Sequence, residues 1–131
     1  MRRASIALVL LLAVACGHAQ LYVGQESEML FFGTQRQDSD VVSETEWRQF
    51  LANVITPRFP DKLTWWAAEG QWRNGKAETE HERTYILQVL HPANARVNGP
   101  LAEIISEYKR RFAQEAVLHV RSYVWMPSSS E

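Results

Sequence analysis

The chain has 131 residues, of which 46% are hydrophobic and 22% are charged, and its formal net charge is −1 at pH 7. With a net charge this close to zero, we expect no strong attraction to nucleic acids or anionic lipids. The single cysteine excludes a disulfide framework, so the mature part, about 110 residues, must be held together by one hydrophobic core.

The first nineteen residues have the three parts of an export signal. Arg2 and Arg3 precede an apolar run that ends at Ala15, and small residues follow the run. The run is shorter than the roughly 20 apolar residues that a membrane-spanning helix needs. We therefore expect an exported protein of the periplasm or envelope, with residues 1–19 as signal and cleavage region and residues 20–131 as one domain.

Two types of cleavage remain open at the end of this signal. The segment 13–16 resembles a bacterial lipoprotein box, in which Cys16 becomes the lipidated N-terminus, although the usual leucine stands one position too early, at Leu12. Ordinary signal peptidase would instead cut after Ala15 or after Ala19, where small residues occupy the required positions. A lipid on Cys16 is the only attachment to a membrane that the sequence predicts.

The first strand and the first helix are predicted from a change in hydrophobic period. An extended apolar run covers 29–34 and predicts a strand. Ser43 then stands three residues before Glu46, the spacing of a helix-starting capping box. Pro57 ends the helix, because it disfavours a helical residue before it. The helix has one apolar face at helical spacing, formed by Trp47, Phe50, Leu51 and Val54.

A hairpin is predicted next, with strands over 63–68 and 83–90 separated by the turn dipeptide Asn74-Gly75. The first of these strands contains the adjacent pair Trp65-Trp66. Neighbouring residues of a strand point to opposite faces, so one of the two tryptophans should be partly exposed.

The chain should end in a second helix and a fourth strand over 117–126. The helix is predicted from apolar residues at helical spacing, namely Leu101, Ile104, Ile105, Tyr108 and Phe112. The resulting order βαββαβ is that of a ferredoxin-like α+β fold. Right-handed crossovers give an antiparallel sheet with strand order 4-1-3-2 and both helices on one face. We expect the tail 127–131 to be disordered.

The fourth strand alternates between apolar residues and a polar, aromatic set. We expect the second set to lie on the sheet face that the helices leave open, where it would bind a partner, and it consists of His119, Arg121, Tyr123 and Trp125. Packing against a second subunit, as a homodimer, is the other interpretation of this face. RNA is excluded as a partner, because exported proteins seldom meet it and the charge is balanced.

Blocks of residues along most of the domain resemble a known family. The most specific are Thr56-Pro57-Arg58-Phe59-Pro60 and Gln114-Glu115-Ala116-Val117-Leu118, and they are accompanied by Phe32-Gly33, Trp47, Phe50, Gly70-Gln71-Trp72, Glu82-Arg83, Tyr108 and Phe112. They resemble the bacterial exported proteins catalogued as domain of unknown function 3574. Where that family usually has Asp-Gly, this chain has Asp61-Lys62. The resemblance implies an exported domain and no particular activity or cofactor.

The predicted topology brings polar residues together at the hairpin edge of the sheet. They are Gly33, Gln71, Trp72, Glu82, Arg83, Gln114 and Glu115. Glu82 and Glu115, with Arg83 nearby, would form a carboxylate site for acid/base work or cation binding. In the alternative interpretation, Arg83 pairs with a glutamate and Gln114 holds backbone. Arg58 falls at the opposite edge, where we expect it to bond carbonyls at the end of the first helix.

No motif for a metal or cofactor is present. His81, His91 and His119 lack the helical spacing and cysteine companions of zinc sites, and neither a phosphate-binding glycine loop nor Gly-x-Ser-x-Gly occurs. We therefore expect no metal and no cofactor. The favoured function is a non-enzymatic envelope protein that binds a protein or small ligand, or pairs with itself through the open face. The alternative is a small enzyme using Glu82 and Glu115.

Overall fold

The structure is a computed structural model that describes residues 21–36, 40–73 and 77–128, without the side chains of Trp72, Arg73 and Glu80. Its elements, in chain order, are β1 (Tyr22–Gly33), α1 (Glu44–Phe50), the π-helical turn η1 (Leu51–Ile55), β2 (Leu63–Arg73), β3 (Thr79–Pro92), α2 (Asn98–Phe112) and β4 (Leu118–Pro127). The four strands form one antiparallel sheet in the order β2-β3-β1-β4. The predicted ferredoxin-like α+β fold is confirmed.

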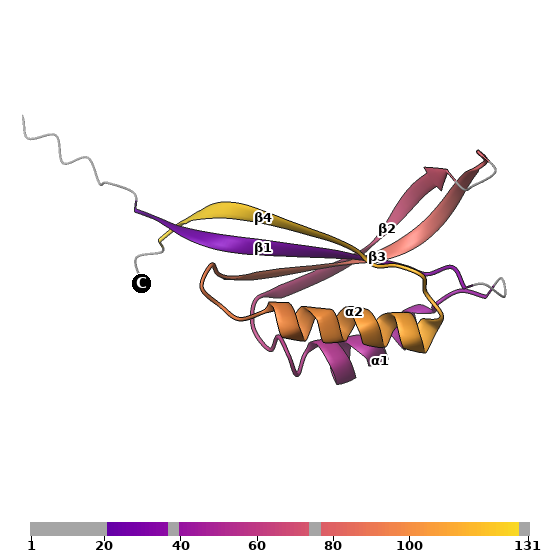
Figure 1. Cartoon of the computed structure of the whole chain (residues 1–131), viewed down its shortest axis with the longest axis horizontal. Helices are drawn as coiled ribbons and strands as arrows, with labels where there is room; N and C mark the ends of the chain where they lie inside the picture. The colour runs from indigo at the N-terminus through magenta and orange to yellow at the C-terminus, as the bar shows by residue number, and fades with distance from the viewer. Residues whose placement is uncertain (1–20, 37–39, 74–76, 129–131) are drawn as a thin grey trace, which may run out of the picture.

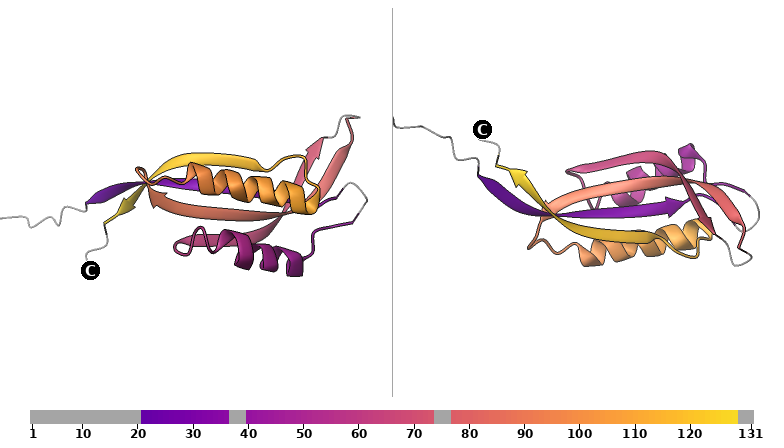
Figure 2. Two further views of the ribbon diagram at one scale, coloured as in Figure 1. Left: turned by 60° about the horizontal axis from the view of Figure 1, so that its bottom comes forward. Right: turned by 90° about the horizontal axis from the view of Figure 1, so that it is seen from above.

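Both helices lie on the same side of the sheet, and no element of the described chain covers the other side (Figures 1 and 2). The core between the two layers is mainly aromatic. Trp47 stacks on Tyr85 with ring centroids 4.8 Å apart, and Phe32 packs against both Trp47 and Tyr108 at 5.1 and 4.7 Å. These rings are fully or almost fully buried.

The first helix begins as the sequence predicts. The side chain of Ser43 accepts a hydrogen bond from the amide of Glu46, and the Glu46 carboxylate accepts one from the amide of Ser43, which completes the capping box. At the other end, the Arg58 guanidinium donates to the carbonyl oxygen of Val54 over 2.7 Å, as predicted, and pairs with Glu103 on α2. Arg58 therefore joins the two helical segments.

Two strands extend beyond their predicted limits. β1 begins at Tyr22 rather than at residue 29, because its polar first half pairs with β4 as far as the Tyr22–Pro127 pair. The amide of Ser128 then donates to the carbonyl of Leu21 over 2.7 Å. The first two residues of the tail that we predicted to be disordered thus belong to the fold, and residues 129–131 lie outside the described chain.

The prediction of which alternating set of β4 residues faces the helices is wrong. Arg121 pairs directly with Glu28, and His119 with Leu30; residues that pair directly across two strands share one face. Leu30 is fully buried in the core beneath the helices. The set His119, Arg121, Tyr123 and Trp125 therefore lies on the helix side, and the apolar set of β4 lies on the open side. The prediction failed because it assumed that the more apolar phase of an edge strand faces the helices.

The hairpin agrees with its prediction where it is described. Trp65 packs at the core and Trp66, on the opposite face, is partly exposed. The predicted turn Asn74-Gly75 lies outside the described residues. None of the described helices has the length and hydropathy that crossing a membrane demands.

Candidate functional site

The most unusual group in the structure is the side chain of Glu28, a carboxylate that is completely buried. Glu28 lies on the helix side of β1, in the same phase as the core residues Leu30 and Phe32. The strand register places His91 of β3 opposite Glu26, and Arg121 of β4 opposite Glu28. Three strands therefore bring charged side chains to one point, beyond the aromatic part of the core.

Three cationic or potentially cationic groups contact the Glu28 carboxylate. Oε1 accepts a hydrogen bond from Arg121 Nε over 2.6 Å and lies 3.1 Å from His91 Nε2, whereas Oε2 lies 2.6 Å from His119 Nε2. Arg121 is itself held by Asn98 Oδ1, which accepts from its Nη2 over 2.5 Å at the start of α2. We call Glu26, Glu28, His91, His119 and Arg121 the Glu28 cluster.

The charge of Glu28 is stabilised by these neighbours. Burial raises the pKa of a carboxyl group, because it penalises the charged form. Hydrogen bonds from His119, His91 and Arg121 outweigh burial here, so the pKa of Glu28 is lower than usual. The side chain is thus a buried carboxylate anion rather than a neutral acid.

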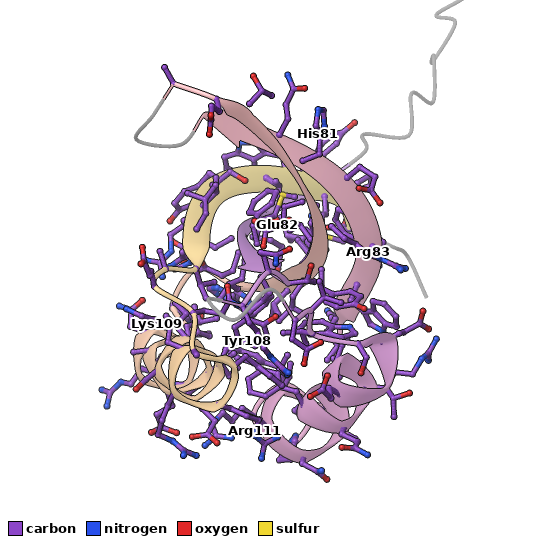
Figure 3. The ribbon with its side chains drawn as sticks, turned by 90° about the vertical axis from the view of Figure 1, so that its right-hand side faces the viewer. His81, Glu82, Arg83, Tyr108, Lys109 and Arg111 are labelled. Atoms are coloured by element: carbon purple, nitrogen blue, oxygen red, sulfur yellow. The ribbon has the colours of Figure 1, made fainter. Side chains whose placement is uncertain are left out.

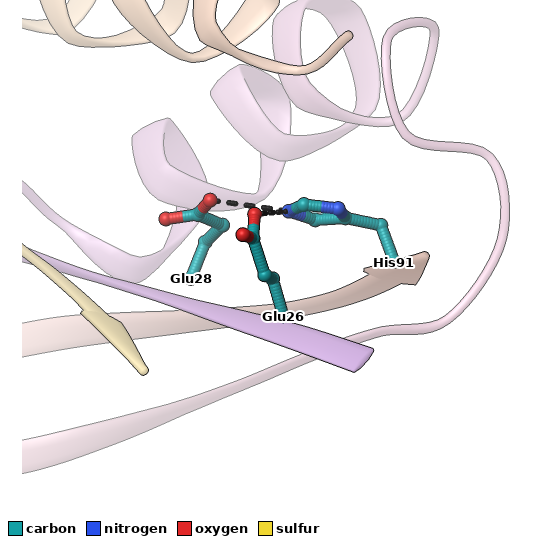
Figure 4. A group of neighbouring side chains, drawn as sticks. All are labelled: Glu26, Glu28 and His91. Carbon is teal, nitrogen blue, oxygen red and sulfur yellow. Dashed lines mark hydrogen bonds and ion pairs between the residues drawn. The ribbon is translucent and has the colours of Figure 1, made fainter. Parts of the chain in front are cut away.

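His91 is nearly buried and faces oxygen atoms from both of its ring nitrogens. Its Nδ1 lies 2.9 Å from the carbonyl oxygen of Pro92, and its Nε2 lies 3.1 Å from Glu28 and 3.9 Å from Glu26. Figure 4 shows the ring directed at both carboxylates. Ligand atoms of Glu26, Glu28 and His91 all lie within 4.8 Å of one another, close enough to hold one metal ion.

Glu26, Glu28 and His91 were not predicted as site residues, and His91 was considered only among histidines that lack the spacing of a zinc site. One signal was available: Glu28 precedes Leu30 and Phe32 at spacing two, so it continues the inward phase of a strand. That signal is weak, because a polar residue in this position is usually taken as the end of a strand.

The hairpin edge brings together only part of its predicted set. The Glu82 carboxylate accepts a hydrogen bond from the Gln35 amide over 2.7 Å, and Gln114 Nε2 donates to the Gln35 carbonyl over 2.8 Å. Glu82 also packs closely over Gly33. In Figure 3, Glu82 lies on the inner side of the curved hairpin, and His81 and Arg83 lie outside it. Glu82 and Gln114 thus hold the chain that follows β1.

The remaining predicted residues of this edge point elsewhere. Arg83 pairs with Glu44 at 3.9 Å and lies over the Tyr85 ring. Gln71 and Glu115 are exposed, and no hydrogen bond or ion pair within the described chain joins Glu82 to Glu115. The side chain of Trp72 is outside the described part. A groove of about 670 Å³ lies between the helical segments, where Arg58 and Glu103 pair.

On β4, Tyr123 and Trp125 are 64% and 70% exposed. They pair with Glu26 and Gly24 in the first half of β1, and the β1–β4 ribbon extends past the helices (Figure 1). The Trp125 ring covers Gly24, its partner on β1. A Cβ added at Gly24 would lie 3.5 Å from the nearest atom of this ring, which is ordinary van der Waals contact. The two aromatic rings are therefore accessible on the helix side.

The open face of the sheet consists of direct cross-strand rows without a charged residue. One row runs Trp66–Ile86–Phe31–Leu118, and the next runs Thr64–Gln88–Met29–Val120. The third joins Leu90, Ser27 and Ser122. At the centre, Gln88 Nε2 donates to Ser27 Oγ over 3.0 Å, so these two polar groups satisfy each other. We call these three rows the open face.

Fold and site together define a small α+β domain with a ferredoxin-like sheet, a charged cluster on its helix side and an apolar open face. The chain belongs to the family described as "Protein of unknown function (DUF3574)", whose model matches residues 27–127. The predicted membership of this family is confirmed. No curated protein matches the chain.

Two solved structures of a phage SAM lyase have a similar fold. The complex with S-methyl-5'-thioadenosine superposes with a TM-score of 0.59 at 15% identity, covering 83% of this chain and 94% of that chain. The apo state gives a TM-score of 0.53 at 14% identity, covering 82% and 93%. At this identity the likeness concerns the fold alone.

Proposed function

We propose that this protein is a non-enzymatic interaction domain of the cell envelope that pairs with a second copy of itself through the open face. The observation that carries the proposal is the uncharged character of three consecutive rows across the sheet. Exposed apolar patches of this kind mark interaction surfaces in soluble proteins. The export signal predicted over residues 1–19 supports the envelope as the location.

A second copy suits this face better than a polar ligand or peptide. The two central polar side chains, Gln88 and Ser27, are hydrogen-bonded to each other, so they offer little to a partner that needs polar anchors. A neutral apolar surface is also complementary to itself, since a twofold axis brings no like charges together. The most exposed apolar positions of the open face are Leu118 and Val120, on the edge strand β4.

The size of the sheet is compatible with a dimer. At usual spacings four strands are about 19 Å wide and the nine-pair β1–β3 ladder is about 30 Å long, a projected area of about 570 Å². A standard interface buries about 800 Å² of accessible surface on each partner. Accessible surface exceeds projected area because side chains roughen it, so an interface that covers this side of the sheet over all nine pairs, beyond the three rows of the open face, approaches this requirement.

The test is the mass of the protein in solution, measured by light scattering during gel filtration. We expect the purified protein to be a dimer. Val120→Glu, at a position that is 43% exposed, should give a folded monomer, because each copy would then bury an unpaired charge at the interface. Circular dichroism verifies that the variant keeps its fold.

Trp125→Ala is the matched control from the same strand. Trp125 points to the helix side, so its removal should leave the dimer intact. A wild-type protein that is monomeric at about 100 µM, well above the micromolar range of weak specific complexes, would contradict the proposal. So would a dimer that survives Val120→Glu and dissociates in Trp125→Ala.

A second candidate function is an enzyme that acts on a small molecule. It is supported by the likeness in fold to a phage SAM lyase, which extends over 94% of that chain, and by the buried charges of the Glu28 cluster. Its predicted carboxylates, Glu82 and Glu115, support it less, since Glu82 is engaged with backbone. A melting temperature raised by SAM or S-methyl-5'-thioadenosine would favour this candidate, and an unchanged one would favour the interaction domain.

A further inference from the structure

Both ring nitrogens of His91 face oxygen atoms, which decides what each nitrogen can bind. The carbonyl oxygen of Pro92 can only accept, so Nδ1, at 2.9 Å, carries the ring proton. In neutral imidazole the other nitrogen, Nε2, then has a lone pair. Nε2 faces two carboxylates, Glu28 at 3.1 Å and Glu26 at 3.9 Å; its contact with Glu28 is a hydrogen bond, which a metal ion bound between these atoms would replace. Arg121 Nε is the cation that these two carboxylates share, 2.6 Å from Glu28 and 3.9 Å from Glu26, so a metal ion bound here has to take its place.

We propose that Glu26, Glu28 and His91 bind a divalent cation of the zinc class. Two carboxylate oxygens and one imidazole nitrogen are a ligand set that Zn²⁺ accepts, with a fourth position open to water. A histidine that ligates a metal commonly donates its other ring N–H to a backbone carbonyl, which fixes the tautomer and the direction of the ring. His91 makes that bond to Pro92.

The distances agree with a shared ion. For an ion about 2.1 Å from each ligand atom, the 3.1 Å between His91 Nε2 and Glu28 Oε1 corresponds to an angle of about 95° at the ion. The 3.9 Å between His91 Nε2 and Glu26 Oε2 corresponds to about 135°. The ligand atoms lie within 4.8 Å of one another, so a small rotation of the Glu26 side chain completes the set.

The other two members of the Glu28 cluster have opposite effects on such an ion. His119 Nε2 lies 2.6 Å from the second oxygen of Glu28 and orients the carboxylate. Arg121 competes, because its Nε donates to the same oxygen, Oε1, that faces His91. Arg121 is partly exposed and a positive charge so close to a divalent ion is repelled. We therefore expect the ion to displace Arg121 from Oε1.

This site is independent of the proposed dimer. The Glu28 cluster lies on the helix side of the sheet and the open face on the other, so either can fail without the other. The ligands also come from β1 and β3 of the same chain, so one copy holds the complete set.

The experiment is a calorimetric titration of the purified protein with ZnCl₂. We expect one ion per chain, reversal by EDTA and a melting temperature that rises with zinc. His91→Gln and Glu26→Gln should each weaken binding by about tenfold or more. Arg121→Gln should tighten it, because it removes the competing positive charge. Glu28→Gln is avoided as the main variant, since its burial makes folding sensitive to it.

His81→Gln is the matched control, since it removes an exposed histidine ten residues away on the same strand, about 33 Å along it. Binding should persist in this variant and in Cys16→Ser/His18→Gln, which removes the other candidate ligands near the N-terminus. Absence of zinc binding by the wild-type protein, or equal binding by His91→Gln, would overturn the proposal.

Discussion

Lys62, in the turn before β2, has a φ of 56°, in the left-handed region that favours glycine. The same position is the one where the family resemblance implies glycine. The left-handed conformation costs a residue with a Cβ about 1–2 kcal/mol of folding free energy. Glycine avoids this cost, but its greater freedom in the unfolded chain cancels about 0.5–1 kcal/mol of the advantage. The turn is therefore of the type that Asp-Gly forms, although Lys62 occupies it.

Lys62→Gly should raise the free energy of unfolding by about 0.5–1 kcal/mol. Urea denaturation followed by tryptophan fluorescence measures this change. Lys62→Ala is the control, because it removes the same charge and keeps the Cβ, and it should give no gain. Equal effects of the two substitutions would mean that charge, and not backbone conformation, matters here.

Glu46 connects the start of α1 to the chain before it. The hydrogen bond from Arg36, supported by those from Ser43, lowers the pKa of Glu46 to about 2 from an ordinary 4.5. A carboxyl group with a lowered folded pKa stabilises the protein above its unfolded pKa and loses that contribution as the pH falls through the folded pKa.

Glu46→Gln should therefore melt at a lower temperature than the wild type at pH 7. The difference should shrink as the pH falls from about 4.5 to about 2. Glu44→Gln removes a charge from the same helical turn without touching the capping box, and provides the baseline. A difference that stays constant over this pH range would contradict the assigned role of the carboxylate.

At the scale of elements, α1 is attached to the sheet chiefly through Trp47. Its ring stacks on Tyr85 of β3 and contacts Phe32 of β1. The indole Nε1 is buried and, among the described residues, has no hydrogen-bond partner. The ring therefore contributes through packing, and its N–H contributes a penalty.

Trp47→Ala should lower the free energy of unfolding by about 3–5 kcal/mol. Trp47→Phe keeps an aromatic ring and removes the unpaired N–H, so its loss should be clearly smaller. Urea melts of both variants measure the two values. Full stability of Trp47→Ala would mean that the helix does not pack through this face.

The helices were predictable because each had a local signature. The Ser43–Glu46 capping box fixed the start of α1, and the apolar residues of α2 recur at helical spacing. The strands were harder. β1 was predicted too short, because its first half is polar, and the partners of these polar residues lie on β3 and β4, far away in the sequence. The face of β4 was misassigned for a related reason: periodicity separates two phases of a strand but does not say which one faces the helices.

At the scale of the whole molecule, the strand order was predictable from connection rules, and the Glu28 cluster was not. Glu28 is 63 residues from His91 and 93 residues from Arg121. Motif spacing along the chain has no information about such pairs. The exact register of three strands decides which side chains meet, and register depends on turns and partner strands together. The predicted hairpin edge succeeded only where Glu82 and Gln114 bond the same short segment.

The hydrogen bond between Ser128 and Leu21 places both ends of the described chain at the same pole of the sheet, away from the β2–β3 hairpin (Figure 1). If Cys16 carries a lipid, four residues lie between it and Leu21, so the two are separated by at most about 18 Å of extended chain, and this pole faces the bilayer. Two copies anchored in one leaflet must then direct the same pole toward it. Their twofold axis would run along the strands, parallel to the membrane normal, with both hairpins pointing away from the lipid.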